Sequence, residues 1–154
     1  MTSSGPGARE RLARAGLDLP IHRVPTASYL AGRRHGDVLY CAGVTSAAGG
    51  GPVAAGGAID AARDAARDAA LRQLASIEHE LGSLDRVADV LRLTGYVACT
   101  AGFTHCPAVL DAASEVFITA FGEKGRHARS AIGVAALPLD ATVEIETIIA
   151  LQAP

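Results

Sequence analysis

A long apolar stripe with a helical period constrains this chain more than any other feature. Between residues 59 and 81 the apolar side chains recur every three or four positions, which indicates a helix with one buried face. The stripe consists of Ala, Leu and Ile, and only 4% of the chain is aromatic, so the core must be built mainly from Ala, Val, Leu and Ile. We therefore expect a close-packed interior around this helix, which Gly82 should end.

The other elements are expected on both sides of this helix. Two short strands, at 28–34 with Tyr29 and at 37–43, should form a hairpin around His35-Gly36-Asp37, because Gly and Asp favour turns. The remaining predicted elements are a strand at 87–100, a helix at 107–121, and strands at 128–137 and 142–150. The order ββ, helix, β, helix, ββ favours an α+β domain with an antiparallel or mixed sheet and both helices on one face. The open face of the sheet is then expected to be buried against other subunits.

The 154 residues suit one domain. Residues 1–20 are expected to be an N-terminal extension, loose over residues 1–8 and helical over 9–15, and residues 21–152 a single folded domain. The segment 46–58 contains five glycines and lacks an apolar period, so it is expected to be a mobile loop.

Charge and hydropathy exclude several classes of protein. The formal net charge of −2 gives no electrostatic attraction to nucleic acid. No run approaches the ~20 apolar residues that span a bilayer, and the first residues lack the apolar stretch of a signal peptide, so we expect a cytoplasmic protein that does not contact membranes. Three cysteines without C-x-x-C spacing argue against a disulfide framework and against a zinc site, so the thiols should be reduced.

Arg129 is the first candidate for chemistry. In a strand it shares a face with Ala131 and Gly133, and such small neighbours leave room for a ligand. A guanidinium pairs with a carboxylate through two hydrogen bonds, so a small acid could bind there. On spacing alone, an arginine at a strand end in solvent or in an ion pair is the favoured interpretation, because this arrangement is commoner in proteins.

Two glutamates on the last strand are the second candidate. Glu144 and Glu146 share one face, and a carboxylate in a partly dry place can deprotonate water as a general base. The alternative is two glutamates on a solvated face. Whether either reaches Arg129 depends on the strand register or on a neighbouring chain. A Cys106 nucleophile beside His105 is a weaker candidate, because adjacent side chains rarely face each other.

Four segments resemble, in order, the RidA/YjgF family of enamine and imine deaminases. The resemblance covers residues 25–150 and is carried by Tyr29-Leu30-Ala31-Gly32, by residues 38–43, by Leu84-Asp85-Arg86-Val87, and by the segment GRHARSAIGVAALPLDATVEIETIIA at 125–150. An ordered match of several parts is more specific than any single motif. The sequence of residues 103–130 is most similar to a YjgF-like branch of the family.

The resemblance implies a chorismate-mutase-like α+β fold, a homotrimer with ligand clefts between subunits, and no metal or other cofactor. It implies hydrolysis of small 2-imino or enamine acids, of the 2-iminobutanoate or 2-iminopropanoate type, to 2-oxo acids and ammonia. By the same resemblance Arg129 binds the substrate carboxylate, the main chain of Ala131 contacts the nitrogen, and Glu144 positions water. Tyr29 and Gly43 are expected to line the cleft.

This chain departs from the family pattern at three positions of the expected cleft. Asp111 stands where the family commonly has Asn, Val44 replaces a frequent Gln, and Ala131 replaces a frequent Cys. A carboxylate at Asp111 would repel an anionic substrate unless it is protonated or turned away. Arg126 and His127 are expected to make the rim of the cleft more basic, which would suit a larger anion.

Two other functions therefore stay open. One is a trimer that binds small carboxylic acids without turnover, for which Asp111 is the reason. The other is the endoribonuclease activity often attributed to this family, against which the pI of about 6.2 and the scarcity of aromatic residues argue.

Overall fold

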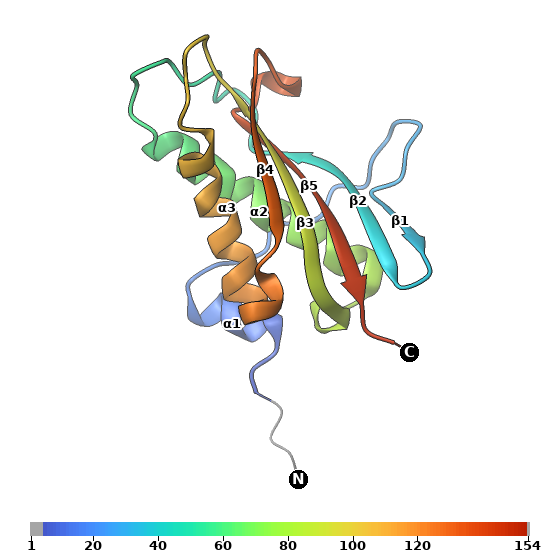
Figure 1. Cartoon of the computed structure of the whole chain (residues 1–154). Coiled ribbons are helices and arrows are strands. Elements are labelled where there is room, and N and C mark those ends of the chain that lie inside the picture. Colours follow the sequence, from blue (N-terminus) through green and yellow to red (C-terminus); the bar gives the residue numbers. More distant parts are fainter. Residues whose placement is uncertain (1–4, 154) are drawn as a thin grey trace.

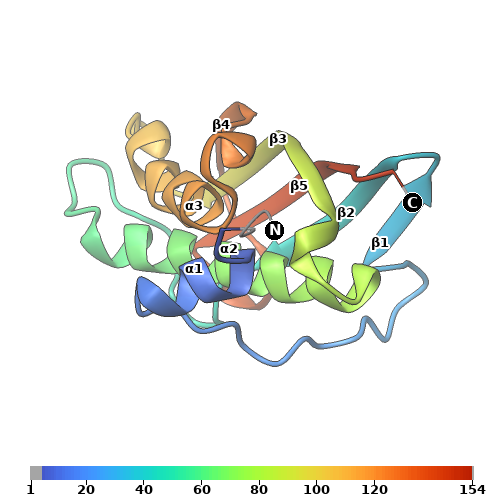
Figure 2. The same cartoon turned by 90° about the horizontal axis from the view of Figure 1, so that it is seen from below.

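A five-stranded sheet carries three helices on one of its faces (Figures 1 and 2). The structure is a computed structural model and describes residues 5–153. In chain order the elements are α1 (Ala8–Arg14), β1 (Gly32–His35), β2 (Val38–Thr45), α2 (Asp60–Leu81), β3 (Val87–Ala98), α3 (Cys106–Phe121), β4 (Ala128–Val134) and β5 (Val143–Leu151). The predicted α+β class and the placement of both long helices on one face are confirmed.

Helix α2 forms where the apolar period predicted it. Ala66, Ala70 and Leu74 of its stripe are fully buried. Gly82 follows with a φ of 78°, the left-handed conformation that ends a helix at low cost for glycine. The small side chains allow α2 to pack closely against α3 and the sheet, as the composition required.

The strand order is β1-β2-β5-β3-β4, with β3 and β4 parallel and all other pairs antiparallel. The chain therefore does not join β4 and β5 as a hairpin; β5 lies between β2 and β3 instead. The burial pattern accounts for this placement. Alternate residues of β5 are buried, from Val143 to Leu151, as expected for a central strand, whereas β4 has no fully buried residue and forms an edge of the sheet.

Strand β1 begins later than expected. Its pairing with β2 starts at Gly32, which faces Cys41, and the residues before it form a bend. At the same point of β2, on its other edge, the register with β5 shifts between Cys41 and Val44, where a β-bulge interrupts that ladder. Tyr29, expected on the first strand, is therefore in the bend before it, with 56% of its surface exposed.

Both segments expected to be loose make defined contacts. Ala8 and Leu12 of α1 are buried, and the Ala8 amide donates to Asp85 Oδ1 at 2.8 Å, so the expectation of a loose segment is wrong at Ala8. Residues 1–4 of that segment lie outside the described residues. In the loop 46–58, the Val53 amide donates to the Ala98 carbonyl at 2.8 Å, which attaches the middle of the loop to the end of β3.

The face of the sheet opposite the helices carries exposed apolar side chains. On this face Tyr40 of β2 and Ile132 of β4 are 50% and 42% exposed, and Ile148 of β5 is partly exposed. Among residues 5–153, no helix has the length and apolar character needed to cross a membrane.

Candidate functional site

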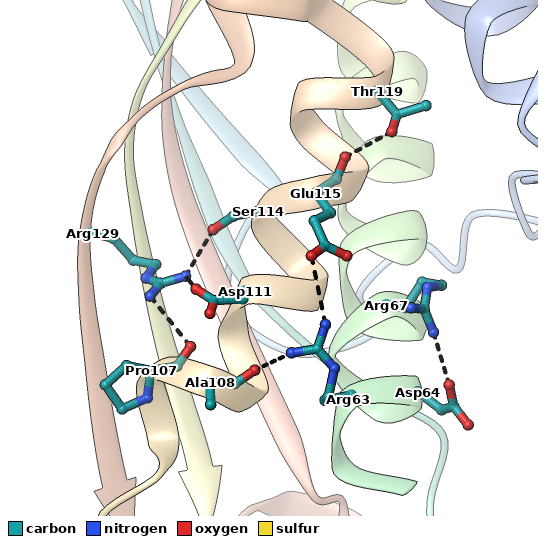
Figure 3. A network of polar contacts seen from close by, with 10 residues as sticks. All are labelled: Arg63, Asp64, Arg67, Pro107, Ala108, Asp111, Ser114, Glu115, Thr119 and Arg129. Carbon is teal, nitrogen blue, oxygen red and sulfur yellow. Dashed lines mark hydrogen bonds and ion pairs between the residues drawn. The ribbon is translucent and has the colours of Figure 1, made fainter. Parts of the chain in front are cut away.

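Arg129 lies on the edge strand and points toward helix α3 (Figure 3). Its neighbour in the sheet is the fully buried Leu93, so Arg129 is on the helix face. Nη1 donates to Asp111 Oδ1 at 2.9 Å and to Ser114 Oγ at 3.0 Å, and Nη2 donates to the Pro107 carbonyl at 3.3 Å. A guanidinium has five N–H donors, and these bonds use three of them. The other two have no partner among the described residues and are available to a ligand.

His127, the residue directly before β4, completes this network. Its Nδ1–H donates to the Gly125 carbonyl at 2.7 Å, so its Nε2 accepts from the Ser114 hydroxyl at 3.0 Å. Burial lowers the pKa of His127, the hydrogen bond to the Gly125 carbonyl opposes this shift, and the positive charge of Arg129 adds to it, so the surroundings favour the neutral imidazole. Sequence reasoning missed Ser114, although it lies three residues after Asp111, on the same face of α3.

The expected basic rim is wrong at His127 and stays a prediction at Arg126. His127 is turned inward against α3, where burial favours its neutral form. Arg126 is 67% exposed and pairs with Glu123 at 3.7 Å. Both residues precede β4, but His127 is two positions from Arg129 and shares its side of the chain, whereas Arg126 is three positions away and lies on the other side.

Glu144 lies directly over Gly43 on the opposite face of the sheet. A Cβ built at Gly43 would overlap Glu144 Oε1, so only glycine lets the carboxylate settle against the backbone of the bulge. Burial raises the pKa of the Glu144 carboxyl above its ordinary value, and the charge of Glu146 raises it further. Glu146 is exposed and accepts from the Tyr96 hydroxyl at 3.3 Å. Glu144 is thus the glutamate whose surroundings suit a general base.

Arg129 and Glu144 cannot meet within one chain. Val143 and Ile145, the neighbours of Glu144, are fully buried on the helix face, so Glu144 points away from it. Arg129 lies on the helix face, and β3 separates the two strands. Glu144 therefore does not reach Arg129 within a single chain. A site that uses both residues needs two copies of the chain.

Gln73 is a second residue that sequence reasoning missed. It is a fully buried polar side chain on α2. With its amide nitrogen turned toward the sheet, it donates to the Ala42 carbonyl at 3.3 Å and to the Ile145 carbonyl at 3.1 Å. These carbonyls flank Gly43 and Glu144, so Gln73 braces the bulge beneath the carboxylate. A polar residue inside an otherwise apolar helical stripe was the available signal.

Replacing Gln73 with leucine should destabilise the fold by about 1 to 3 kcal/mol, because two buried carbonyls lose their donor. Chemical denaturation followed by circular dichroism measures the change. Arg67→Ala, which removes an exposed pair with Asp64 on the same helix, is the control and should change stability by less than about 0.5 kcal/mol. Equal stability of Gln73→Leu and the native protein would show that the amide does not brace the bulge.

The other expected cleft residues fall into two groups. Tyr29, Gly43 and Val44 line one cavity of about 670 Å³ between β2, α2 and the segment 21–26. Ala131 lies beside Arg129 on the helix face of β4, partly buried against the core. The structure thus groups Arg129, Asp111 and Ala131 at one edge, and Tyr29, Gly43 and Glu144 around the bulge.

The cysteines do not form a reactive centre. All three are free thiols. Burial raises the pKa of Cys41 to about 11, and burial together with the neighbouring Cys99 raises the pKa of Cys106. Thiols so far from ionisation are poor nucleophiles, which disfavours the Cys106 and His105 pair. Across residues 5–153, no three His, Cys, Asp or Glu side chains gather as metal ligands would.

Comparison with known proteins places the chain in a family. The profile described as Endoribonuclease L-PSP matches residues 20–151. Protein TCP17 of Trypanosoma cruzi is 35% identical over 147 residues, which are 92% of each chain. The solved structure of Atu1372 from Agrobacterium tumefaciens, a protein of unknown function, is 32% identical with a TM-score of 0.84, covering 94% of this chain and 92% of that one.

A candidate endoribonuclease from Shewanella oneidensis has a TM-score of 0.87 at 26% identity, covering 95% of this chain and all of that one. RidA from an Antarctic Psychrobacter shares the fold, with a TM-score of 0.53 at 23% identity over 84% of this chain and 94% of its own. The profile match across nearly the whole chain and the shared fold lead to one conclusion: this chain belongs to the L-PSP family, also known as the YjgF/RidA family.

Proposed function

We propose that this protein hydrolyses reactive 2-imino and enamine acids to 2-oxo acids and ammonia, in clefts between the subunits of a homotrimer. The observation that carries the proposal is the placement of Arg129 and Glu144 on opposite faces of one sheet. An anchor for a carboxylate and a candidate base occur in the same chain but can act together only across an interface. Membership of the YjgF/RidA family supports this chemistry.

Features of the sheet support the assembly. Strand β4 is an edge strand, so one row of its backbone groups lacks a partner strand within a single chain. Beside it, the open face presents Tyr40 and Ile132, both about half exposed. Packing of identical copies would cover both surfaces. It would also bring Arg129 of one copy toward Glu144 of the next.

The proposed reaction needs few groups. The Arg129 guanidinium holds the carboxylate of the substrate. Glu144 takes a proton from a water molecule while the oxygen of that water attacks C2 of the C=N bond. The nitrogen of the resulting carbinolamine takes up the proton that Glu144 removed from water. The C–N bond then breaks, ammonia leaves, and the hydroxyl group loses its proton to Glu144 or solvent as the C=O bond of the 2-oxo acid forms. The main chain near Ala131 would hold the nitrogen.

A coupled assay tests this proposal. An amino-acid oxidase generates the 2-imino acid, and semicarbazide traps whatever imine has not been hydrolysed. The purified protein should lower the yield of trapped imine, in proportion to its concentration, for at least one of several amino acids. An unchanged yield for all of them, in an assay where a known imine deaminase abolishes trapping, would disprove catalysis. Sedimentation analysis should show a trimer.

Binding of small carboxylic acids without turnover is the second candidate, and the ion pair between Arg129 and Asp111 favours it. An arginine already paired with a carboxylate holds a substrate carboxylate less firmly. Calorimetry that detects binding of 2-oxo acids, together with an inactive imine assay, would support this function instead.

Ribonuclease activity comes from the family's name and from the Shewanella oneidensis relative. The net charge of −2 provides little attraction for RNA, which argues against ribonuclease activity. RNA cleavage that co-purifies with the protein through stringent repurification, and that is lost in a site variant, would establish it.

A further inference from the structure

Asp111 determines what an incoming ligand meets at Arg129. Its Oδ1 accepts from Arg129 Nη1 at 2.9 Å, and its side chain is 56% exposed whereas that of Arg129 is 21% exposed (Figure 3). The carboxylate is therefore the more accessible partner of the pair. Any acid that uses the free N–H groups of Arg129 must lie beside both a positive and a negative charge.

Ligands of different charge respond differently to such a pair. A simple anion such as a 2-oxo acid is attracted by Arg129 but repelled by Asp111. An acid with a protonated nitrogen next to its carboxylate can use both charges, because its N–H group donates to Asp111 while its carboxylate accepts from Arg129. Ser114 and the neutral His127 add no charge to this balance.

We propose that Asp111 makes the Arg129 site selective for zwitterionic acids, meaning iminium acids and amino acids, over 2-oxo acids. This inference rests on the proposed function for its substrate, but the selectivity concerns binding alone. This selectivity would make the site bind the protonated substrate more tightly than the product. The iminium acid carries the cation that Asp111 accepts, whereas the 2-oxo acid has lost it with the ammonia.

The test compares three ligands with the same carbon skeleton by NMR titration of the full-length protein. Alanine is the zwitterion, pyruvate is the 2-oxo acid, and propanoate is an anion with neither group. The native protein should bind alanine at least tenfold more tightly than pyruvate or propanoate. In Asp111→Asn the affinity for both anions should rise and that for alanine should fall, so that the ratio changes by at least tenfold.

A matched control separates a local effect from a general change of charge. Glu115 lies one helical turn from Asp111 and pairs with Arg63 at 3.5 Å, away from Arg129. Glu115→Gln removes the same charge and should leave the ratio of affinities unchanged. A shift of the ratio in Glu115→Gln as large as in Asp111→Asn would overturn the proposal.

The remaining outcomes are also decisive. If Asp111→Asn changes the affinity for all three ligands by one factor, Asp111 only positions Arg129, and the proposal is wrong. It is equally wrong if the native protein binds pyruvate as tightly as alanine, or binds none of the ligands. Selective binding of alanine by a protein that is inactive in the imine assay would uphold the selectivity and refute the proposed catalysis, so the two failures can be told apart.

Discussion

Replacing Arg129 with alanine is expected to lower kcat/KM for imine hydrolysis by about 10- to 150-fold. Two charge-assisted hydrogen bonds between a guanidinium and a carboxylate contribute about 1.5 to 3 kcal/mol, and alanine removes both. Arg129→Lys keeps the charge but not the planar pair of donors, so it should recover only part of the activity. Steady-state kinetics in the imine-trapping assay measures all three proteins.

Arg126→Ala is the matched control for this prediction. It removes the same charge near the start of β4, but Arg126 is exposed and pairs only with Glu123 within the described chain, so its activity should match that of the native protein. The thermal midpoint of each variant should be recorded, because Arg129 also connects β4 to α3. Full activity of a folded Arg129→Ala protein would exclude Arg129 as the substrate anchor.

Replacing Glu144 with glutamine should reduce kcat by about 10²- to 10⁴-fold, the usual contribution of a general base, with a much smaller effect on KM. Glutamine has nearly the same shape, so it can occupy the space over Gly43 but cannot take a proton from water. Glu146→Gln is the control, two residues away on the same face. A Glu144→Gln enzyme with native kcat would show that Glu144 is not the base.

The pH profile gives a second signature of Glu144. A base works only when deprotonated, and burial followed by the charge of Glu146 raises the pKa of Glu144. Activity should therefore fall on the acid side at a higher pH than for an ordinary glutamate. Glu146→Gln removes the neighbouring charge, lowers the pKa of Glu144 and should move this acid limb to lower pH. A limb that stays in place would mean that another group controls it.

The helices were predictable because their signal is local. The stripe at 59–81 corresponds to α2, Asp60–Leu81, and the helix expected at 107–121 begins one residue earlier as α3. A period of three and four residues and a terminal glycine depend only on neighbours along the chain. The strand bounds were less accurate, because a strand ends where its partner stops pairing, as β1 does at the bulge in β2.

The candidate site was predictable by residue type but not by arrangement. Strand alternation placed Arg129 beside Ala131 and placed Glu144 with Glu146, and both pairs share a face in the structure. Alternation shows which residues of one strand share a face. It does not show whether residues of two different strands lie on the same face of the sheet. That depends on the insertion of β5 between β2 and β3, a contact between distant parts of the chain.

By itself, the sequence determined the class of fold and the extent of both long helices, and it singled out Arg129 and Glu144 as candidates for binding and activating a small acid, because each of these follows from local period and side-chain chemistry. Only the tertiary structure decided that Asp111 pairs with Arg129, that His127 turns toward Ser114 of α3, and that Arg129 and Glu144 point to opposite faces. These features depend on how β4 packs against α3 and on the order of strands, which are set by long-range packing.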